Sequence, residues 1–524
     1  MLIGDIAANN ARRYPDKTAL VDADRVHTWS QVDERARRLA NHLAAQGLTA
    51  GDRVMVIARN CIEWPEISFG LAKAGLVAVP VNIRLAPDEV AHVRDDSGAQ
   101  AVLIHAEHSE KFLAELAGLR LVLAIGPEYE SALASADPRT PQVDVSPDDV
   151  AVILYTSGTT GRAKGVMHTH RALLYQAADT NLVTEANRSD VMLATTPFFT
   201  AGGMVRTVSW LYLGQTMVIH QRFDPQAVID EIERSKITFT TFIPTMLHRT
   251  LAILEDGPPR DMSSLRRISY GSAPVPPGLA RKAMDLLGCD LQQRYGLTEC
   301  GGQATILTPQ DHRDIIAGRT SIATSCGRET PMCVIRIVDS DGSDTATGEV
   351  GEIVIASPAN AVGYWNRPEQ TAEVFGPDGL RSGDLGYLDG DGYLHITGRK
   401  TDMIISGGFN VYPAEIERVI AHHAGVDLVA VVGAPDREWG ETPVAVVIPK
   451  SHVTDRDALS AELMALCRAE LAGYKQPRRF LFWSEFPLGP AGKILKREIA
   501  NQVNRAVDES AMTPVSTGST REQP

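Results

Sequence analysis

A ten-residue segment, 156–165, concentrates side chains that suit phosphate binding. Its sequence, TSGTTGRAKG, holds four hydroxyl side chains, three glycines and two cations. Glycines let backbone N–H groups converge on one point, Ser and Thr add donors that rotate, and Lys164 supplies a flexible positive charge. The segment does not fit the G-x-x-x-x-G-K-[ST] loop, because Ala163 stands where that pattern requires Gly. We therefore expect a phosphate-binding loop of another kind.

The position of this segment supports the same interpretation. It directly follows an apolar run, 150–155 (VAVILY), which predicts a β-strand. A flexible Ser/Thr/Gly loop without a ligand is the alternative. Ligands of α/β proteins bind at the carboxyl ends of strands, and this favours the phosphate site.

A second segment, 295–299 (YGLTE), offers three groups that a nucleotide requires. The flat face of Tyr295 can stack on a base, the Thr298 hydroxyl can donate to a phosphate oxygen, and Glu299 can bind a hard divalent cation. Four shorter segments occur around it in the chain: 271–274 (GSAP), 382–385 (SGDL), 398–400 (GRK) and 490–493 (PAGK).

In this order, the segments resemble the signatures of the adenylate-forming superfamily, which includes acyl- and aryl-CoA synthetases. The resemblance covers nearly the whole chain except its C-terminal tail. It implies that Tyr295 packs on adenine, that Thr298 contacts the α-phosphate and that Glu299 is the metal ligand for Mg²⁺. One departure is Ala163, where the family usually has Pro.

The resemblance implies two further sets of residues. The nucleotide-binding set is Thr156, Ser157, Gly158, Thr159, Thr160, Gly161, Gly271, Ser272, Ala273, Pro274, Tyr295, Gly296, Asp384 and Arg399. The catalytic set is Lys164, Thr298, Glu299 and Lys493.

The activity that the resemblance implies is that of an ATP-dependent acid–thiol ligase. A carboxylate attacks the α-phosphorus of ATP, giving acyl-AMP and pyrophosphate, and the acyl group then passes to coenzyme A. Two anions must meet in the first step, so catalysis consists mainly of positioning and charge neutralisation. Lys164, Lys493 and Mg²⁺ would supply the positive charge.

The acid pocket is implied to include Phe198, Phe199, Thr200, Gly202, Gly203, Gly301 and Gly302. These glycines could equally well serve backbone turns alone. If they line the pocket, it is roomy, and no Lys or Arg is evident there for a second acid group. We therefore expect a bulky hydrophobic monocarboxylic acid, either cyclic, aromatic or fatty.

The thiol acceptor depends on the C-terminal region. In the family, a small domain swings about a hinge just after Arg399, and the resemblance implies that Ser406, Gly407, Gly408 and Lys475 bind CoA. The hinge residue is Thr401, where the family usually has Asp or Lys. An enzyme that stops at acyl-AMP or loads a carrier protein is therefore one alternative. A non-catalytic nucleotide or acyl-CoA binding protein is another.

Alternating patterns predict the elements that position these residues. Apolar runs at 52–60, 76–82, 99–105 and 119–126 are typical of strands, and helical patterns lie between them, including 109–118. This alternation predicts parallel strands of an α/β fold, with a second α/β half from residue 150. Short strands with Gly/Asp turns follow from about 331. We expect a large N-terminal adenylation domain of two α/β subdomains and a β-rich subdomain (1–399), a mobile α+β domain (400–507) and a disordered tail (508–524).

Composition limits the partners and the compartment. The net charge of −14 argues against nucleic acid as a partner. The chain has no apolar run long enough for a membrane span, its N-terminal residues do not form a signal peptide, and its six cysteines are scattered. We expect a cytoplasmic enzyme that acts on a small carboxylic acid, ATP and CoA, and a homodimer is compatible with the sequence.

Overall fold

The computed structural model describes residues 1–156, 162–271, 273, 275–436, 439–487 and 494–512. The chain divides into two compact units. The first contains residues 1–382 and 387–395, and the second contains residues 383–386 and the described residues from Ile396 onward. The predicted boundary after Arg399 stays a prediction.

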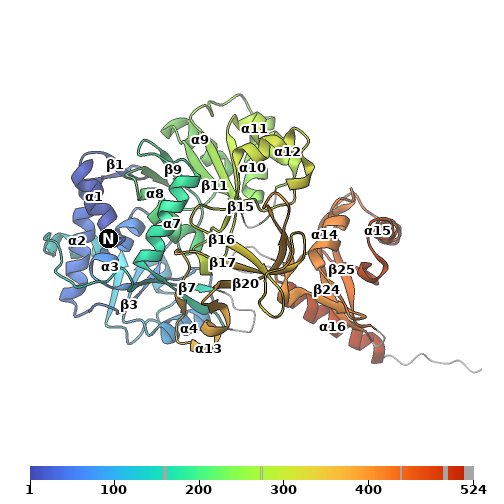
Figure 1. Cartoon of the computed structure of the whole chain (residues 1–524). Coiled ribbons are helices and arrows are strands. Elements are labelled where there is room, and N and C mark those ends of the chain that lie inside the picture. Colours follow the sequence, from blue (N-terminus) through green and yellow to red (C-terminus); the bar gives the residue numbers. More distant parts are fainter. Residues whose placement is uncertain (157–161, 272, 274, 437–438, 488–493, 513–524) are drawn as a thin grey trace, which may run out of the picture. The chain divides into compact units, whose positions relative to one another are not determined.

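The first unit is built on two large sheets (Figure 1). Within the described residues, one sheet has nine strands in the order β15 (Arg328–Glu329), β14 (Thr305–Leu307), β13 (Asp290–Tyr295), β12 (Arg267–Gly271), β11 (Phe239–Phe242), β9 (Val191–Ala194), β10 (Thr216–Ile219), β1 (Thr18–Asp22) and β2 (Arg25–Thr28). The other has seven, in the order β18 (Gly363–Tyr364), β8 (Lys164–Thr169), β7 (Val150–Thr156), β4 (Val77–Pro80), β3 (Arg53–Ile57), β5 (Ala101–His105) and β6 (Leu121–Ile125).

Strand β3 shows why the apolar runs are continuous. Side chains alternate between the two faces of a strand. Val54 and Val56 pack into the core between the two sheets, whereas Met55 and Ile57 pack into the core on the other face. Both faces of the strand are buried beyond Arg53, so every later position is apolar, as is typical of parallel sheets covered on both sides.

Helices fill the space between the sheets and cover their outer faces (Figure 1). The central layer contains α1 (Asp5–Arg13), α2 (Trp29–Ala45), α3 (Glu63–Lys73), α7 (His170–Val183) and α8 (Ala201–Leu211). The nine-stranded sheet is covered outside by α9 (Pro225–Ser235), α10 (Pro244–Asp256) and α11 (Pro277–Leu287), with α12 (Pro309–Ile316) packed on α11 and β13. The seven-stranded sheet is covered by α4 (Pro87–Ser97), and α5 (Ala106–Ser109) and α6 (Pro127–Ser135) flank β6. The predicted mixed α/β class is confirmed.

Local patterns were wrong at two places. In place of the expected helix 109–118, α5 ends at Ser109 and residues 110–118 form a series of turns. Some amides there bond four residues back and others three, as in Leu116 N to Phe112 O and Ala117 N to Ala114 O. Its apolar spacing reflects Phe112 and Leu116, which reach the core from these turns. The expected disordered tail begins as helix, since α16 (Lys496–Met512) includes 508–512. Residues 513–524 lie outside the described part.

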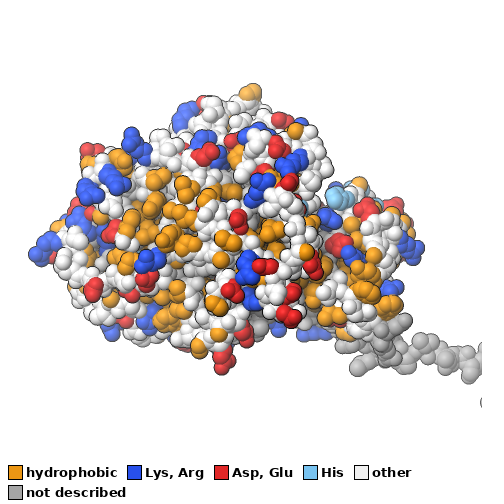
Figure 2. Space-filling view, viewed as in Figure 1, with side chains coloured by type: hydrophobic (Ala, Val, Ile, Leu, Met, Phe, Trp, Pro, Cys, Tyr) orange, Lys and Arg blue, Asp and Glu red, His pale blue; other side chains and the backbone are white. Residues whose placement is uncertain are grey.

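A third sheet follows in the chain, as the Gly/Asp turns predicted. Its strands are β16 (Val334–Val338), β17 (Gly351–Ala356), β20 (Gly379–Leu388) and β19 (Phe375–Gly376), with β21 (Leu394–Arg399) paired to β20. Helix α13 (Pro368–Val374) packs on β18 and β19. In Figure 2, apolar side chains gather over the middle of the visible face of the first unit, and most acidic and basic side chains lie around them.

The second unit is a small α+β domain. Its sheet has the order β23 (Phe409–Val411), β22 (Ile404–Ser406), β25 (Gly440–Pro449) and β24 (Val426–Asp436), with β26 (Arg479–Phe482) paired to β25. Helices α14 (Pro413–Ala421) and α15 (Arg456–Glu470) cover one core, and α16 covers another. None of the helices in the described part of the chain combines the length and apolar character that crossing a membrane requires.

Candidate active site

The predicted phosphate loop connects two antiparallel strands. Thr156 ends β7 and lies opposite Lys164, which begins β8. Residues Ser157, Gly158, Thr159, Thr160 and Gly161 lie outside the described residues. The sequence predicted β7 but not β8, and the two strands pair antiparallel.

Helix α4 and the tight packing of Gly165 against Ile153 hold the base of this loop. His92 Nε2 lies 2.9 Å from the Ala163 carbonyl oxygen, and the Tyr155 hydroxyl donates to Asp96 over 2.8 Å. A Cβ at Gly165 would lie 2.5 Å from Ile153 Cγ2, so a larger residue there would displace the Ile153 side chain. The base of the loop is therefore held by hydrogen bonds to α4 and by tight packing.

The YGLTE segment makes a tight reversal after β13. Thr298 and Glu299 belong to a 3-10 turn, η1 (Thr298–Cys300), and the Ala304 amide donates to the Tyr295 carbonyl over 2.8 Å. A Cβ at Gly296 would lie 2.5 Å from the Gln303 amide nitrogen, which explains the glycine. The chain thus presents Thr298 and Glu299 immediately beyond a strand's carboxyl end.

Tyr364, which the sequence analysis missed, joins two of the predicted catalytic residues. Its hydroxyl donates to Glu299 Oε1 over 2.9 Å, and Lys164 Nζ lies 5.3 Å from the centre of its ring. Burial and the Glu299 carboxylate raise the pKa of Tyr364, so the hydroxyl keeps its proton and donates. The Ala361 amide also donates to the Glu299 carbonyl over 2.8 Å. In the sequence, the short segment GYWN (363–366) is the only local feature that could have pointed to Tyr364.

The adenine-side segment begins at the end of β12. Gly271 is paired with Arg294 on β13, and a Cβ at Gly271 would lie 2.9 Å from the Arg294 carbonyl oxygen. Ala273 is exposed, whereas Ser272 and Pro274 lie outside the described residues. Adenine binding by this segment stays a prediction.

The first predicted acid-pocket segment, 198–203, mainly stabilises the local structure around the start of α8. The Thr200 hydroxyl caps α8 by accepting from the Gly203 amide over 3.1 Å, and it donates to the Pro197 carbonyl over 2.8 Å. A Cβ at Gly203 would lie 2.0 Å from that same carbonyl oxygen. Phe198 is buried edge-on against Trp64 in the core. Phe199 and Gly202 remain partly exposed, and the pocket roles of all of these residues stay predictions.

The second predicted acid-pocket segment is a pair of glycines in left-handed conformation. Gly301 has φ of 72° and Gly302 has φ of 85°. A Cβ at Gly301 would lie 3.2 Å from Oε1 of Gln176 on α7. The neighbouring Gln303 side chain donates to Asp179 on the same helix over 2.9 Å. The turn thus faces the central helical layer.

In the second unit, Asp384 and Arg399 come together. Arg399 Nε lies 3.0 Å from Asp384 Oδ1, and the carboxylate is buried while the guanidinium is partly exposed. A carboxylate held this way can accept from a sugar hydroxyl. Lys493 lies outside the described residues, so its catalytic role stays a prediction.

The predicted CoA segment is a tight hairpin turn. Ser406 ends β22, and Gly407 and Gly408 have φ of 57° and 83°. A Cβ at Gly407 would lie 2.5 Å from the Trp439 ring. Lys475 is paired with Glu415, with both carboxylate oxygens at 2.8 Å.

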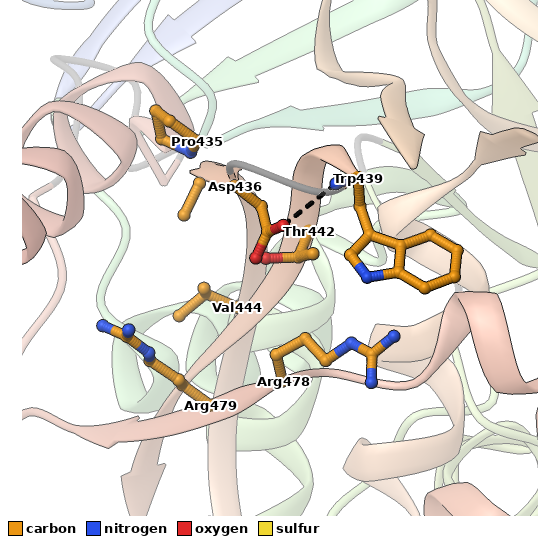
Figure 3. A pocket seen from close by; sticks show the side chains of 8 residues that line it. Pro435, Asp436, Trp439, Thr442, Val444, Arg478 and Arg479 are labelled. Carbon is orange, nitrogen blue, oxygen red and sulfur yellow. Dashed lines mark hydrogen bonds between the residues drawn. The ribbon is translucent and has the colours of Figure 1, made fainter. Parts of the chain in front are cut away.

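A pocket of about 250 Å³ lies next to this turn in the second unit (Figure 3). Figure 3 shows the Arg478 side chain extending beneath the Trp439 indole, with Arg479 on the other side of Val444. The Arg478 guanidinium carbon lies 5.4 Å from the Trp439 ring centre. The Trp439 amide donates to Asp436 over 2.9 Å. An aromatic face beside two guanidiniums suits an anionic ligand with a planar group.

One group of possible metal ligands lies elsewhere, in the first unit. Cys61, Glu63 and His105 offer atoms within 4.8 Å of one another. Glu63 is already bonded to Arg25, and burial raises the pKa of the Cys61 thiol. The carboxylate is therefore neutralised by a guanidinium, which disfavours a cation there.

Comparison with known proteins agrees with this arrangement. Residues 7–365 match the family model for an AMP-binding enzyme, and residues 415–493 match that for the AMP-binding enzyme C-terminal domain. The chain is 38% identical over 501 residues to a feruloyl-CoA synthase of an Amycolatopsis species, covering 95% of this chain and 98% of the relative. It is 36% identical over 507 residues to a fatty acid–acyl-carrier-protein ligase of Streptomyces coeruleorubidus, covering 94% and 95%.

A solved structure shows the same fold. The o-succinylbenzoate CoA synthetase from Bacillus subtilis, in complex with its acyl-adenylate intermediate, superimposes with a TM-score of 0.83. Its sequence identity is 29%, and the match covers 94% of this chain and 97% of that one. The chain therefore belongs to the AMP-binding enzyme family, the adenylate-forming acyl-CoA synthetases.

Proposed function

We propose that this chain joins a carboxylic acid with a bulky, largely hydrophobic body to coenzyme A, with ATP as the energy source and acyl-AMP as the intermediate. The observation that carries the proposal is the contact of Tyr364 with both Lys164 and Glu299. It brings a cation and a carboxylate next to the base of the phosphate loop. Those are the two groups that Mg-ATP requires.

The first half-reaction needs positioned charge more than acid–base chemistry. Lys164 would neutralise phosphate oxygens, and the Thr298 hydroxyl would donate to the α-phosphate as the acid oxygen attacks. Glu299 fits a Mg²⁺ site, because Tyr364 occupies only Oε1 and Oε2 has no hydrogen bond to the described residues. Mg²⁺ bound there would neutralise phosphate charge. Lys493 would neutralise the carboxylate and the α-phosphate.

The second half-reaction requires access for a thiol. Its sulfur attacks the acyl carbonyl, the acyl–phosphate bond breaks and AMP leaves. The Ser406–Gly408 turn is narrow enough to border a pantetheine arm, and the pocket with Trp439, Arg478 and Arg479 suits an anionic nucleotide. Lys475 forms an ion pair with Glu415. We therefore assign the CoA phosphates to Arg478 and Arg479 rather than to Lys475.

The thiol that accepts the acyl group, from either CoA or an acyl-carrier protein, distinguishes two versions of this function. The relatives include a CoA ligase and a ligase for an acyl-carrier protein, and Thr401 departs from the usual hinge residue. We favour CoA because the second unit offers the Trp439–Arg478 pocket.

Mass spectrometry of the products tests this choice. The protein is mixed with Mg-ATP and a panel of hydrophobic acids, with and without CoA. Acyl-CoA formed only when CoA is present supports the full ligase. Acyl-AMP that accumulates regardless of CoA would restrict the activity to the first half, and no nucleotide turnover with any acid would favour a binding protein.

Two further properties remain part of the proposal. A cytoplasmic location is supported by the cysteines, all of which are free thiols. A homodimer is compatible with the sequence, and sedimentation of the purified protein would decide it.

A further inference from the structure

Two arginines place positive charge in the interior of the first unit. Arg206, on α8, folds back over Gly202, where a Cβ would lie 3.4 Å from its Nη1. The same nitrogen donates to the Thr196 hydroxyl over 3.0 Å. Arg294, on β13, donates from Nε to the Ser269 hydroxyl over 2.6 Å. Both arginines therefore bond to neutral hydroxyls.

The charge of this pair is not balanced. Within the described residues, neither guanidinium forms an ion pair, and Nη2 of Arg294 is buried without a hydrogen-bond partner. Burial lowers the pKa of Arg206 to about 10 and that of Arg294 to about 9, with the charge of Arg206 contributing to the latter. Both groups remain protonated at neutral pH.

Asp179 is the acidic group that acts on Arg294. Its carboxylate accepts from the Gln303 side chain over 2.9 Å and from the Met332 amide over 3.3 Å. Asp179 thus acts on Arg294 alone, and no carboxylate among the described residues acts on Arg206, which leaves an excess positive charge inside the fold. An uncompensated buried charge is costly, and a bound anion removes that cost.

The two arginines connect both segments predicted to line the acid pocket. Arg206 touches Gly202 in the first segment, and Arg294 interacts through Asp179 with Gln303, next to Gly302 in the second. Both arginine residues are partly exposed, although Nη2 of Arg294 itself is buried.

The nucleotide is an unsuitable partner for Arg294. Adjacent side chains on a strand point to opposite faces. Arg294 therefore leaves β13 on the face opposite to Tyr295, which is expected to pack on adenine.

We propose that Arg206 and Arg294 together bind a second carboxylate of the acid substrate, at the end remote from the carboxylate that is adenylated. A guanidinium presents paired N–H donors that match a carboxylate, and the free Nη2 of Arg294 provides one of them. This inference rests on the proposed ligase function, and it replaces the monocarboxylic acid expected from the sequence with a dicarboxylic acid that has a hydrophobic body.

Matched acid pairs test the inference. Aromatic and aliphatic dicarboxylic acids are compared with their mono-methyl esters and with analogues that carry a methyl group in place of the distal carboxylate. Acid-dependent pyrophosphate release should give kcat/KM at least about 100-fold higher for the dicarboxylate in the best pair, since a site built for hydrogen bonding rejects the analogue that lacks the group. A monocarboxylate used as well as or better than every matched dicarboxylate would overturn the inference while leaving the ligase function intact.

Variants identify the residues responsible. Arg206→Met and Arg294→Met should each raise KM for the dicarboxylate at least about tenfold while leaving KM for ATP unchanged, and Arg294→Lys should recover part of the loss. Arg281→Met is the matched control, because Arg281 is exposed and bonds only to the Ile316 carbonyl among the described residues. A merely structural role would instead lower use of all acids and ATP together.

Calorimetry makes the test independent of turnover. The wild-type protein should bind the dicarboxylate, and Arg206→Met should not. This result supports the subsite even if no acid releases pyrophosphate. Equal binding of the diacid by both proteins overturns it.

Discussion

The Tyr364 hydroxyl donates to Glu299 Oε1 over 2.9 Å, and the same aromatic ring lies 5.3 Å from Lys164 Nζ. One tyrosine thus orients the proposed Mg²⁺ ligand and borders the proposed phosphate cation. Lys164 is on β8 and Tyr364 is on β18, its antiparallel neighbour in the sheet. The sheet therefore fixes the spacing between these two residues.

Tyr364→Phe should weaken adenylate formation without unfolding the protein. The substitution removes the hydrogen bond to Glu299 but keeps the ring beside Lys164. A bond to a charged group contributes about 1.5–3 kcal/mol, so kcat/KM for Mg-ATP should fall at least about tenfold. The Mg²⁺ concentration for half-maximal pyrophosphate release should rise.

Tyr393→Phe is the control for that experiment. It removes a similar bond, from the Tyr393 hydroxyl to Asp311 over 2.6 Å, away from the proposed site. Its Mg²⁺ dependence should match the wild type. If Tyr364→Phe shares that unchanged dependence, Tyr364 does not position a metal ligand.

Lys493→Ala should separate the two half-reactions. The lysine is predicted to neutralise charge only when the acid attacks ATP, so adenylate formation should fall about 100-fold or more. Thioester formation from supplied acyl-AMP and CoA should persist.

The control for Lys493→Ala is Lys496→Ala, since Lys496 bonds to Glu417 over 2.6 Å within the second unit. It should keep both activities. Loss of both half-reactions in Lys493→Ala would contradict the assigned role.

Gly407→Ala should slow thioester formation. The residue has φ of 57°, and its new Cβ would lie 2.5 Å from the Trp439 ring, so the ring must move from its place over Arg478. We expect thioester formation to fall about tenfold, and pyrophosphate release in the absence of CoA should not change. Gly473→Ala is the matched control, because no neighbouring atom lies within 4 Å of its added Cβ. Equal rates in both variants would remove the turn from the CoA site.

The first unit should lose stability as the pH falls below neutral. His168 is fully buried on β8, and burial lowers its pKa to about 4. The unfolded chain takes up this proton near its ordinary pKa of about 6.5, whereas the folded chain does not, so acid favours unfolding between these values. His168 alone should lower the free energy of unfolding by about 2 kcal/mol from pH 7 to pH 5.

Urea unfolding at the two pH values, compared with His168→Gln, checks this expectation. The variant should lose about 2 kcal/mol less between pH 7 and pH 5 than the wild type. His248→Gln, at an exposed position of the same unit, should keep the wild-type difference. An unchanged pH difference in His168→Gln would show that this histidine titrates alike in both states.

Some of the fold followed from local patterns. The apolar runs 52–60 and 99–105 predicted the buried strands β3 and β5. The same kind of pattern wrongly predicted a helix at 109–118. Phe112 and Leu116 are spaced as on a helix, but turns also let both side chains reach one core. Strand β8 was missed because His168 and Thr169 made its sequence look polar, although both are buried.

The sequence by itself determined the family, the order of the signature segments and the chemistry that their residue types allow. Those properties reside in neighbouring residues, whose spacing is visible in one dimension. Only the tertiary structure decided that Tyr364 bonds to Glu299 across 65 positions, that Arg206 donates to Thr196 and that Arg294 donates to Ser269. It also decided that β1 joins a sheet with β10, far along the chain. Such contacts depend on how sheets and helices pack, and local periodicity carries no information about that packing.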